Sequence, residues 1–259
     1  MKEIKDSLQS LIRMFNIFFF KRNMPKKISI YFHETGKKEI AEIINIINFY
    51  SYLGYEFVTV SELNRRLNED TNLMAITFDD GFKNWTDLIP IFNKHNVKGT
   101  FYLNSIQFTD ESKEQYLIDI NFKRIEEIIS ESDLKHLHSA GHEIGAHTHT
   151  HKTLSRINYN KFLTEINRNL DFFDDKKINV KSFAIPYGMR RYVKGRQLDY
   201  LMSRFDSVCF GEPGMLFNQK NSLIQRTPWK INNSFIFNIY NICTNTSIFN
   251  RLTKRSGVG

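Results

Sequence analysis

Short apolar runs alternate along most of the chain with longer segments in which apolar residues recur every three or four positions. Residues 28–32 and 73–78 are largely apolar runs of the kind found in buried strands. Residues 39–53 instead carry apolar side chains at helical spacing, and Gly54 ends this predicted helix. Further strands are expected at 57–60, 99–103, 142–145, 182–185, 207–210 and 222–226, and further helices from residue 61 and at 85–95, 126–140, 159–173 and 197–204.

This alternation predicts an α/β domain built on a parallel sheet or barrel. No internal repeat or low-complexity linker divides the chain, and 259 residues suffice for one large domain with a full core. We therefore assign residues 28–228 to one body of catalytic size. Residues 1–27 and 229–259 are interpreted as apolar, basic extensions of that body.

The net charge of +8 is distributed unevenly. Residues 1–27 carry seven Lys/Arg against two Asp/Glu, and residues 213–259 carry six Lys/Arg and no acid, whereas the net charge of residues 28–212 is −3. A nucleic-acid enzyme usually concentrates positive charge around its site, so we expect no nucleic-acid partner. The chain has two cysteines, Cys209 and Cys243, which lie far apart in the sequence. This number is too small for a disulfide framework or a four-cysteine zinc site.

Both ends of the chain are apolar as well as basic. The stretch 8–22 is shorter than the about 20 apolar residues that cross a membrane, and Lys21 and Arg22 stand where a cleavable signal would need small residues. The aromatic stretch 234–249 precedes further Lys/Arg. Two interpretations stay open: the ends close the barrel, or they make peripheral contact with an anionic membrane. We expect a cytoplasmic protein, in the second case at the inner face of the membrane.

Three segments carry candidate chemistry, and the first is Asp79-Asp80-Gly81 after the predicted strand at 73–78. Catalytic groups of parallel α/β folds lie at the carboxyl ends of strands. Neighbouring side chains point in different directions, so one carboxylate could bind a metal while the other activates water. The alternative is an ordinary turn, since Asp and Gly are frequent in turns.

The second segment holds four of the eight histidines within residues 142–151. His147 and His151 are spaced i, i+4, which predicts two imidazoles on one side of a helical turn. By the same spacing His149 faces away, and His142 is interpreted as structural. Catalytic zinc takes three protein ligands, and a carboxylate can be the third. The alternative is a surface histidine run that binds metal only adventitiously.

The third segment is an apolar strand that ends in Pro186-Tyr187-Gly188. A turn after the proline leaves a backbone N–H that can serve an oxyanion hole. A plain turn is the alternative.

In this order the three segments resemble the polysaccharide deacetylase family, also described as the NodB-homology domain or carbohydrate esterase family 4. The segments that match are Thr77 to Gly81, Gly141 to His151 and Phe183 to Gly188, and the likeness covers about residues 28–228. The resemblance implies a distorted (β/α) barrel with about seven parallel strands. It also implies metal-dependent hydrolysis of an N-acyl group, by expectation N-acetyl, on an amino sugar of a cell-surface glycan or its lipid-linked precursor.

The resemblance also implies roles for individual residues. Asp79 would be the general base, and Asp80 would join His147 and His151 in binding one divalent ion, by expectation zinc, with cobalt or nickel as alternatives. The Tyr187 N–H would share in stabilising the oxyanion.

Two features depart from the usual family pattern. No histidine follows His151, so the late motif that commonly supplies the general acid is absent. His33, in Tyr31 to Glu34, resembles the early histidine of a permuted branch that includes the poly-N-acetylglucosamine deacetylases, and we assign the acid to it. Ala184 replaces an arginine that commonly pairs with the catalytic Asp, and Arg226 is the candidate replacement. The alternatives are a histidine hydrogen-bonded at a strand end and a surface arginine.

Two other functions stay open at this point. One is hydrolysis of a different small amide, such as an N-formyl group, which pocket size would distinguish. The other is an inactive barrel that binds a glycan or a partner enzyme, although the four residues with the expected base and metal roles are all present.

Overall fold

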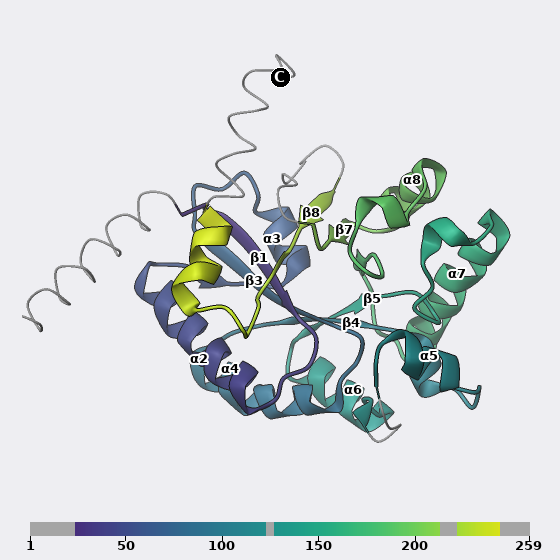
Figure 1. Cartoon of the computed structure of the whole chain (residues 1–259), viewed down its shortest axis with the longest axis horizontal. Coiled ribbons are helices and arrows are strands. Elements are labelled where there is room, and N and C mark those ends of the chain that lie inside the picture. Colours follow the sequence, from purple (N-terminus) through teal and green to yellow (C-terminus); the bar gives the residue numbers. More distant parts are fainter. Residues whose placement is uncertain (1–23, 123–126, 213–221, 244–259) are drawn as a thin grey trace, which may run out of the picture.

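Parallel strands form a barrel whose last segment returns to the first strand. The computed structural model describes residues 24–122, 127–212 and 222–243 (Figure 1). The predictions for residues 8–22, and for 234–249 beyond residue 243, lie outside the described residues. The strands are β1 (Lys27–Phe32), β2 (Glu56–Phe57), β3 (Leu73–Asp79), β4 (Thr100–Leu103), β5 (Glu143–Ala146), β6 (Ser182–Ala184), β7 (Ser207–Phe210), β8 (Leu223–Gln225) and β9 (Thr227–Pro228).

The strand order shows how the barrel closes. It runs β8-β7-β6-β5-β4-β3-β1-β9, every pairing is parallel, and β2 pairs with β3 off this path. β8 and β9 stand at opposite ends of this order, yet Arg226 alone separates them in the chain. One extended segment therefore pairs with β7 on one side and with β1 on the other. Counted as one strand, it gives the described barrel seven parallel strands, which confirms the predicted α/β barrel.

Helices surround the barrel (Figure 1). Apolar side chains of these helices pack in the buried clusters against the strands. In α7 the buried apolar side chains are Phe162, Ile166, Leu170 and Phe173, and the Asn158 side chain caps the first turn by accepting from the Lys161 N–H. The described helices are α2 (Lys37–Tyr52), α3 (Val60–Arg65), α4 (Ile89–His95), α5 (Glu114–Asp119), α6 (Glu131–Ser139), α7 (Tyr159–Asp175) and α8 (Gly195–Arg204), with 3₁₀ turns η1 (Lys83–Leu88), η2 (Ser105–Phe108), η4 (Leu154–Arg156) and η5 (Arg190–Tyr192). None of them is both long and apolar enough to span a bilayer.

Three predicted elements differ from the observed ones for local reasons. The expected strand 57–60 stops at Phe57, because Thr59 caps α3 by accepting from the Glu62 N–H. The helix expected at 85–95 is a 3₁₀ turn followed by α4, with Pro90 in the first turn of α4. The described part of the helix expected at 126–140 begins only at Glu131, because Ser130 forms a capping box with Asp133.

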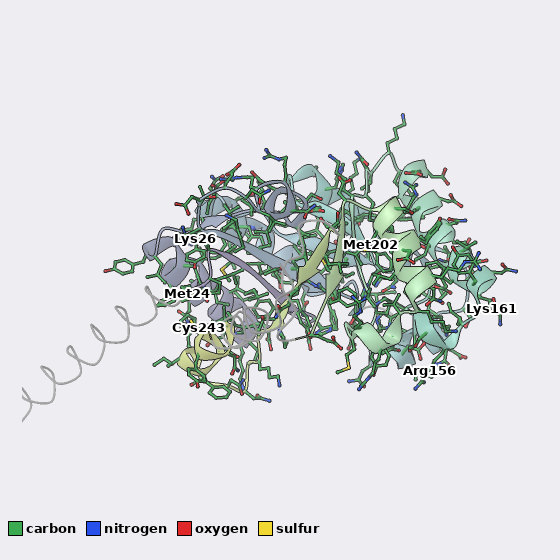
Figure 2. All side chains as sticks on the ribbon, turned by 90° about the horizontal axis from the view of Figure 1, so that it is seen from above. Met24, Lys26, Arg156, Lys161, Met202 and Cys243 are labelled. Carbon is green, nitrogen blue, oxygen red and sulfur yellow. The ribbon has the colours of Figure 1, made fainter. Side chains whose placement is uncertain are left out.

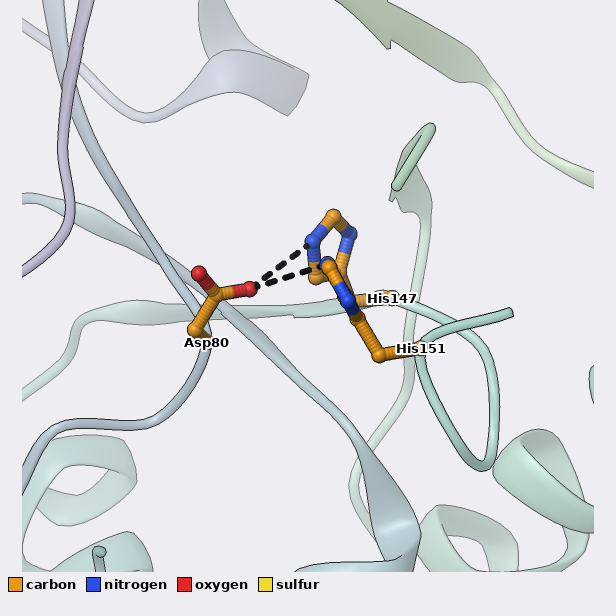
Figure 3. Close-up of side chains that lie close together, drawn as sticks. All are labelled: Asp80, His147 and His151. Atoms are coloured by element: carbon orange, nitrogen blue, oxygen red, sulfur yellow. Dashed lines mark ion pairs between the residues drawn. The ribbon is translucent and has the colours of Figure 1, made fainter. Parts of the chain in front are cut away.

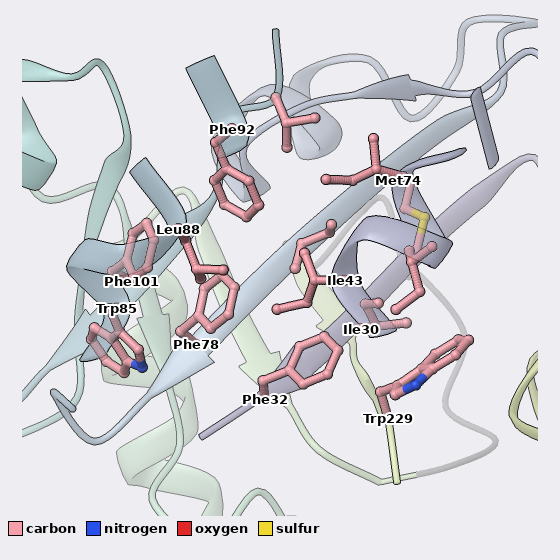
Figure 4. Close-up of a cluster of buried hydrophobic side chains, with 14 of the residues drawn as sticks. Ile30, Phe32, Ile43, Met74, Phe78, Trp85, Leu88, Phe92, Phe101 and Trp229 are labelled. Carbon is pink, nitrogen blue, oxygen red and sulfur yellow. The ribbon is translucent and has the colours of Figure 1, made fainter. Parts of the chain in front are cut away.

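Successive side chains of β3 point alternately into two different buried clusters. Met74, Ile76 and Phe78 point outward to the helices, and Phe78 stacks on Phe101 with ring centroids 4.7 Å apart (Figure 4). Leu73 and Ala75 belong to a smaller cluster with Tyr102, Ala184 and Cys209. Residues 77 and 79 continue this second side. Asp79 is therefore placed toward the barrel interior by the period of its own strand.

Gly145 of β5 makes room for the largest side chain of that smaller cluster. A Cβ at Gly145 would lie 2.3 Å from the Tyr102 ring, whereas a Cβ at Gly195 of α8 would meet nothing within 4 Å. We expect Gly145→Ala to lower the free energy of unfolding by about 1–3 kcal/mol through overpacking. Gly195→Ala should change it by less than about 1 kcal/mol. Urea unfolding followed by circular dichroism measures both, and equal effects of the two variants would contradict this packing.

Candidate active site

Chemically active side chains meet at the carboxyl ends of β1, β3, β5 and β6. They line a pocket of about 450 Å³. The lining includes all seven residues singled out from the sequence: His33, Asp79, Asp80, His147, His151, Tyr187 and Arg226. Carboxyl ends of parallel strands are where such folds hold their reactive groups.

Asp80, His147 and His151 form one compact cluster (Figure 3). The Oδ1 atom of Asp80 lies 3.3 Å from Nε2 of His147 and 3.2 Å from Nε2 of His151. All three residues are buried, and Asp80 Oδ1 has no hydrogen-bond partner among the described residues. Ligand atoms about 2.0–2.2 Å from a tetrahedral zinc ion stand about 3.3 Å apart. The donor set and its spacing therefore fit a divalent ion.

The histidine loop after β5 is not the expected helical turn, so that interpretation was wrong. Thr148 and His151 have positive φ angles of 68° and 57°, and residues 147–151 contain no helix. The His151 N–H instead donates to Thr148 Oγ1, and the Asn104 side chain holds the Thr148 carbonyl at 3.1 Å. The two imidazoles still meet, because this loop turns the chain back within four residues.

The orientation of His147 follows from a backbone contact. Its Nδ1 lies 2.7 Å from the carbonyl oxygen of Ala184, so this nitrogen carries the proton and donates it. The lone pair is then left on Nε2, which faces Asp80. Such an outer hydrogen bond fixes the tautomer that a metal ligand needs.

Asp80 adopts an unusual backbone conformation. Its φ is +81°, and its carbonyl accepts hydrogen bonds from Gln107 Nε2 at 2.7 Å and from the Tyr116 hydroxyl at 2.9 Å. A Cβ on the following Gly81 would lie 2.0 Å from Gln107 Nε2. The glycine therefore admits the side chain that holds this strained turn.

Asp79 and Arg226 form a buried bidentate ion pair. Nη1 of Arg226 lies 2.6 Å from Oδ1, and Nη2 lies 2.8 Å from Oδ2. Arg226 is completely buried, so the alternative of a surface arginine is wrong. Burial is the largest single effect and would raise the pKa of Asp79, but the charge and hydrogen bonds of Arg226, together with the nearby His147 and His33, outweigh it, and the pKa is lowered from its ordinary value. Asp79 is therefore ionised at neutral pH.

Arg226 is also enclosed by aromatic rings. Its guanidinium carbon lies 5.0 Å from the ring centre of Tyr31 and 4.9 Å from that of Tyr102. Nη1 makes a further hydrogen bond of 3.1 Å to Thr77 Oγ1. These contacts hold a desolvated cation in one orientation.

His33 reaches the cluster from the end of β1. Its Nε2 lies 3.7 Å from Asp80 Oδ2, and about half of its side chain is exposed. The His33 carbonyl accepts a hydrogen bond of 2.7 Å from Trp85 Nε1, which anchors the backbone. The side chain thus faces both the cluster and solvent.

Tyr187 lies at the third position of a turn over residues 185–188. The Gly188 N–H donates to the Ile185 carbonyl at 2.9 Å, with Pro186 second and a φ of +62° at Tyr187. Among the described residues, the Tyr187 N–H has no hydrogen-bond partner. The Tyr187 ring packs on His151 with centroids 4.6 Å apart.

The other two histidines of the run lie outside the cluster, as predicted. His142 is buried against Phe92 and Phe101, its Nδ1 accepts from the Gly99 N–H, and burial lowers its pKa to about 4. His149 points instead to the Ser105 hydroxyl, 2.8 Å from Nδ1.

Several pocket residues were not foreseen. Tyr31 had a usable signal, since it stands two residues before His33 on the same side of a strand. Asp119 and Asn121 come from the region of α5, for which no element was predicted. Asp119 is oriented by Lys152, 3.4 Å away.

The sequence also matches the model of a known protein family. The polysaccharide deacetylase family model matches residues 66–198. That is about half of the chain, so the chain belongs to the polysaccharide deacetylase family.

The match to an individual curated protein covers a smaller part of the chain than the family model does. A chitin deacetylase from Arthroderma benhamiae is 33% identical over 87 residues, which are 33% of this chain and 19% of that protein. The chain therefore matches only about a fifth of the length of this curated relative.

Solved structures show the same fold. The Streptococcus pyogenes deacetylase PplD, in complex with acetate, has a TM-score of 0.64 at 16% identity, over 83% of this chain and 97% of that one. A de-N-acetylase from Aggregatibacter actinomycetemcomitans has a TM-score of 0.65 at 14% identity, over 83% and 99%.

The ion pair predicts a pH-dependent loss of stability. Arg226→Met leaves the Asp79 carboxylate buried without its partner, which should lower the free energy of unfolding at pH 7 by about 3–5 kcal/mol. Because the folded pKa of Asp79 is depressed, the pair contributes stability above the unfolded pKa and loses it as pH falls through the folded pKa. The deficit of the variant should therefore shrink toward acidic pH.

Urea unfolding at several pH values measures this deficit. Arg204→Met, at an exposed arginine of α8, is the matched control and should cost little. Adding Asp79→Asn to Arg226→Met should recover part of the loss. If Arg226→Met and Arg204→Met had equal effects, the structural role of the pair would be refuted.

Metal content tests the cluster independently of activity. Asp80→Asn, His147→Ala and His151→Ala should each weaken zinc binding by more than the about 10- to 100-fold that loss of an outer hydrogen-bond partner costs. His149→Ala removes a buried histidine of the same run from outside the cluster and should retain zinc. Equilibrium dialysis with elemental analysis measures the affinity. Full zinc binding by the three cluster variants would disprove this site.

Proposed function

We propose that the protein is a metal-dependent hydrolase that removes an N-acetyl group from an amino sugar. The proposal rests on one observation: two sets of residues line the same pocket. One set is a buried carboxylate paired with Arg226, and the other is the ligand-like cluster around Asp80. Membership in the polysaccharide deacetylase family supports the deacetylation of a glycan.

Asp80, His147 and His151 would hold the ion. When bound there, a divalent ion supplies a Lewis acid that polarises the amide carbonyl and lowers the pKa of water. The other steps are the work of the side chains and backbone around it.

Asp79 is the candidate general base. Arg226 keeps it ionised and fixes both carboxylate oxygens, so its free lone pairs have a defined direction. A carboxylate with a lowered pKa is a weak base, so it takes a proton only from water that is already acidified. A base this weak is therefore suited to a site in which a bound cation acidifies the water.

Tyr187 and His33 would complete the reaction by acting on two different atoms of the amide. The Tyr187 N–H donates to the carbonyl oxygen as that oxygen becomes negative. His33 Nε2 donates a proton to the departing nitrogen, which leaves badly as an anion. Its partial exposure allows it to exchange protons with solvent between turnovers.

The substrate is proposed to be a glycan, or a lipid-linked precursor, that contains N-acetylated amino sugars. The chitin deacetylase match and the family support an amino-sugar polymer. Hydrolysis of another small amide and a non-catalytic binding barrel are the outcomes that an assay separates from this proposal.

Removing either proton-transfer group should slow turnover strongly. We expect Asp79→Asn to lower kcat for acetate release by about 10²–10⁴-fold, and His33→Ala by a similar range, because each removes a proton-transfer group. His138→Ala, at an exposed histidine of α6, should leave kcat unchanged. Acetate release from N-acetylglucosamine oligomers and from lipid-linked N-acetylhexosamines measures the rates.

The assay includes N-formylated sugars as competing substrates. Preferential formate release would replace the N-acetyl assignment, and no release from any substrate would favour the binding barrel. Full activity of Asp79→Asn would contradict the mechanism.

A further inference from the structure

A positively charged surface lies beside the active-site pocket, on the turns η4 and η5 and at the start of α8. Residues 188–198 carry four Lys/Arg and no acid. The turn η5 packs against η4, which adds a fifth cation. Five exposed residues make up this basic surface: Arg156, Arg190, Arg191, Lys194 and Arg196. Figure 2 shows Arg156 at the opposite end of the molecule from Met24 and Cys243, so the surface is remote from both ends of the described chain.

The cations of the basic surface have no carboxylate partner. No ion pair among the described residues involves any of the five, whereas Arg66, Arg168 and Lys176 are each paired with a glutamate. The pKa of Arg191 is raised by the hydrogen bond and charge of Tyr192 and also by Glu212, which forms no ion pair with it. The charges of the surface are therefore available to a ligand.

Aromatic rings hold two of the guanidinium groups next to the pocket. The guanidinium carbon of Arg190 lies 5.8 Å from the ring centre of Phe210, the last residue of β7. That of Arg191 lies 5.0 Å from the ring centre of Tyr192, and its Nη2 donates to the Tyr192 hydroxyl at 3.1 Å. The Tyr192 ring packs in turn on the pocket residue Tyr187, with centroids 5.7 Å apart. Both cations therefore lie at the end of the barrel that holds the pocket.

We propose that the basic surface binds negatively charged groups of the glycan whose acetylated sugar occupies the pocket. The inference rests on the proposed function and names the class of its substrate, an amino-sugar glycan with phosphate or carboxylate groups near the reacting sugar. Guanidinium N–H groups form paired hydrogen bonds with the oxygens of both groups. Stacking on a ring leaves outer N–H groups free and holds them in one orientation.

The charge distribution also determines which part of such a glycan enters the pocket. The pocket lining includes four carboxylates, those of Glu34, Asp79, Asp80 and Asp119. These groups disfavour an anion in the pocket, so the neutral N-acetylated sugar enters it while its anionic neighbours face the basic surface. A neutral glycan would use none of the five positive charges.

The test is isothermal titration calorimetry of the zinc-loaded full chain with three N-acetylglucosamine oligomers of equal length. One is neutral, one carries phosphate on the neighbouring sugars, and one alternates with glucuronate. We expect at least one anionic oligomer to bind about tenfold or more tightly than the neutral one, and the two anionic oligomers show which group is preferred. Added salt should weaken this preference, because exposed charges are screened.

The double variant Arg190→Gln/Arg191→Gln should reduce the preference by at least about tenfold, since two guanidinium groups no longer bond the anion. Arg156→Gln removes a cation of the other turn and should reduce it as well. Arg204→Gln, at an exposed arginine at the far end of α8, is the matched control and should keep the preference.

Equal affinity of the unmodified chain for neutral and anionic oligomers, or an unchanged preference in the double variant, would overturn the proposal. So would tighter binding of a single-stranded oligonucleotide than of either anionic oligomer, because the surface would then serve nucleic acid. Acetate release from the same oligomers distinguishes this inference from the proposed function. Preferential binding of an anionic oligomer without any release would contradict deacetylation and leave the anion-binding surface supported.

Discussion

The contact between Arg226 and Asp79 links the closure of the barrel to its chemistry. Arg226 is the single residue between β8 and β9, the segments that join the two edges of the sheet. Its guanidinium crosses the interior to the last residue of β3 and forms two short hydrogen bonds there. Either charge alone would be buried without compensation, at a cost of several kcal/mol (about 3–5). A closed barrel and an oriented carboxylate are thus mutually dependent.

The geometry of the cluster of Asp80, His147 and His151 depends on unusual backbone conformations just beyond the ends of regular strands. Asp80, Thr148, His151 and Tyr187 all have positive φ angles. Such conformations cost free energy in non-glycine residues and persist only when neighbouring groups hold them. Here the Asp80 carbonyl is held by Gln107 and Tyr116. The strain is concentrated at the rim of the pocket, while the strands below it are regular.

Much of this arrangement could be predicted from the chain. Alternating apolar runs indicated the strands and helices, and the three motifs indicated which strand ends carry polar groups. The helical turn at His147–His151 was wrong, because a four-residue spacing brings side chains together in a helix and also in a tight loop. The Thr148 hydroxyl that accepts from the His151 N–H has no signature in the spacing alone.

Long-range partners were the least predictable part. The buried position of Arg226 depends on β8 and β9 pairing with strands at opposite edges of the sheet, which no local pattern specifies. The charge distribution illustrates the same point. Arg226 was counted with the basic C-terminal end, yet it neutralises Asp79 inside the barrel. The positive charge of that end is therefore one unit smaller than its sequence suggests.

Acetate release by metal-depleted protein, before and after zinc is restored, measures directly whether the Asp79 pocket needs a metal ion to deacetylate a sugar. The substrate is an N-acetylglucosamine oligomer, and the Asp79→Asn variant carried through the same steps is the control. We expect almost no release from depleted protein, recovery on adding zinc, and no recovery in the variant. Equal rates of acetate release from depleted and zinc-restored protein would contradict it.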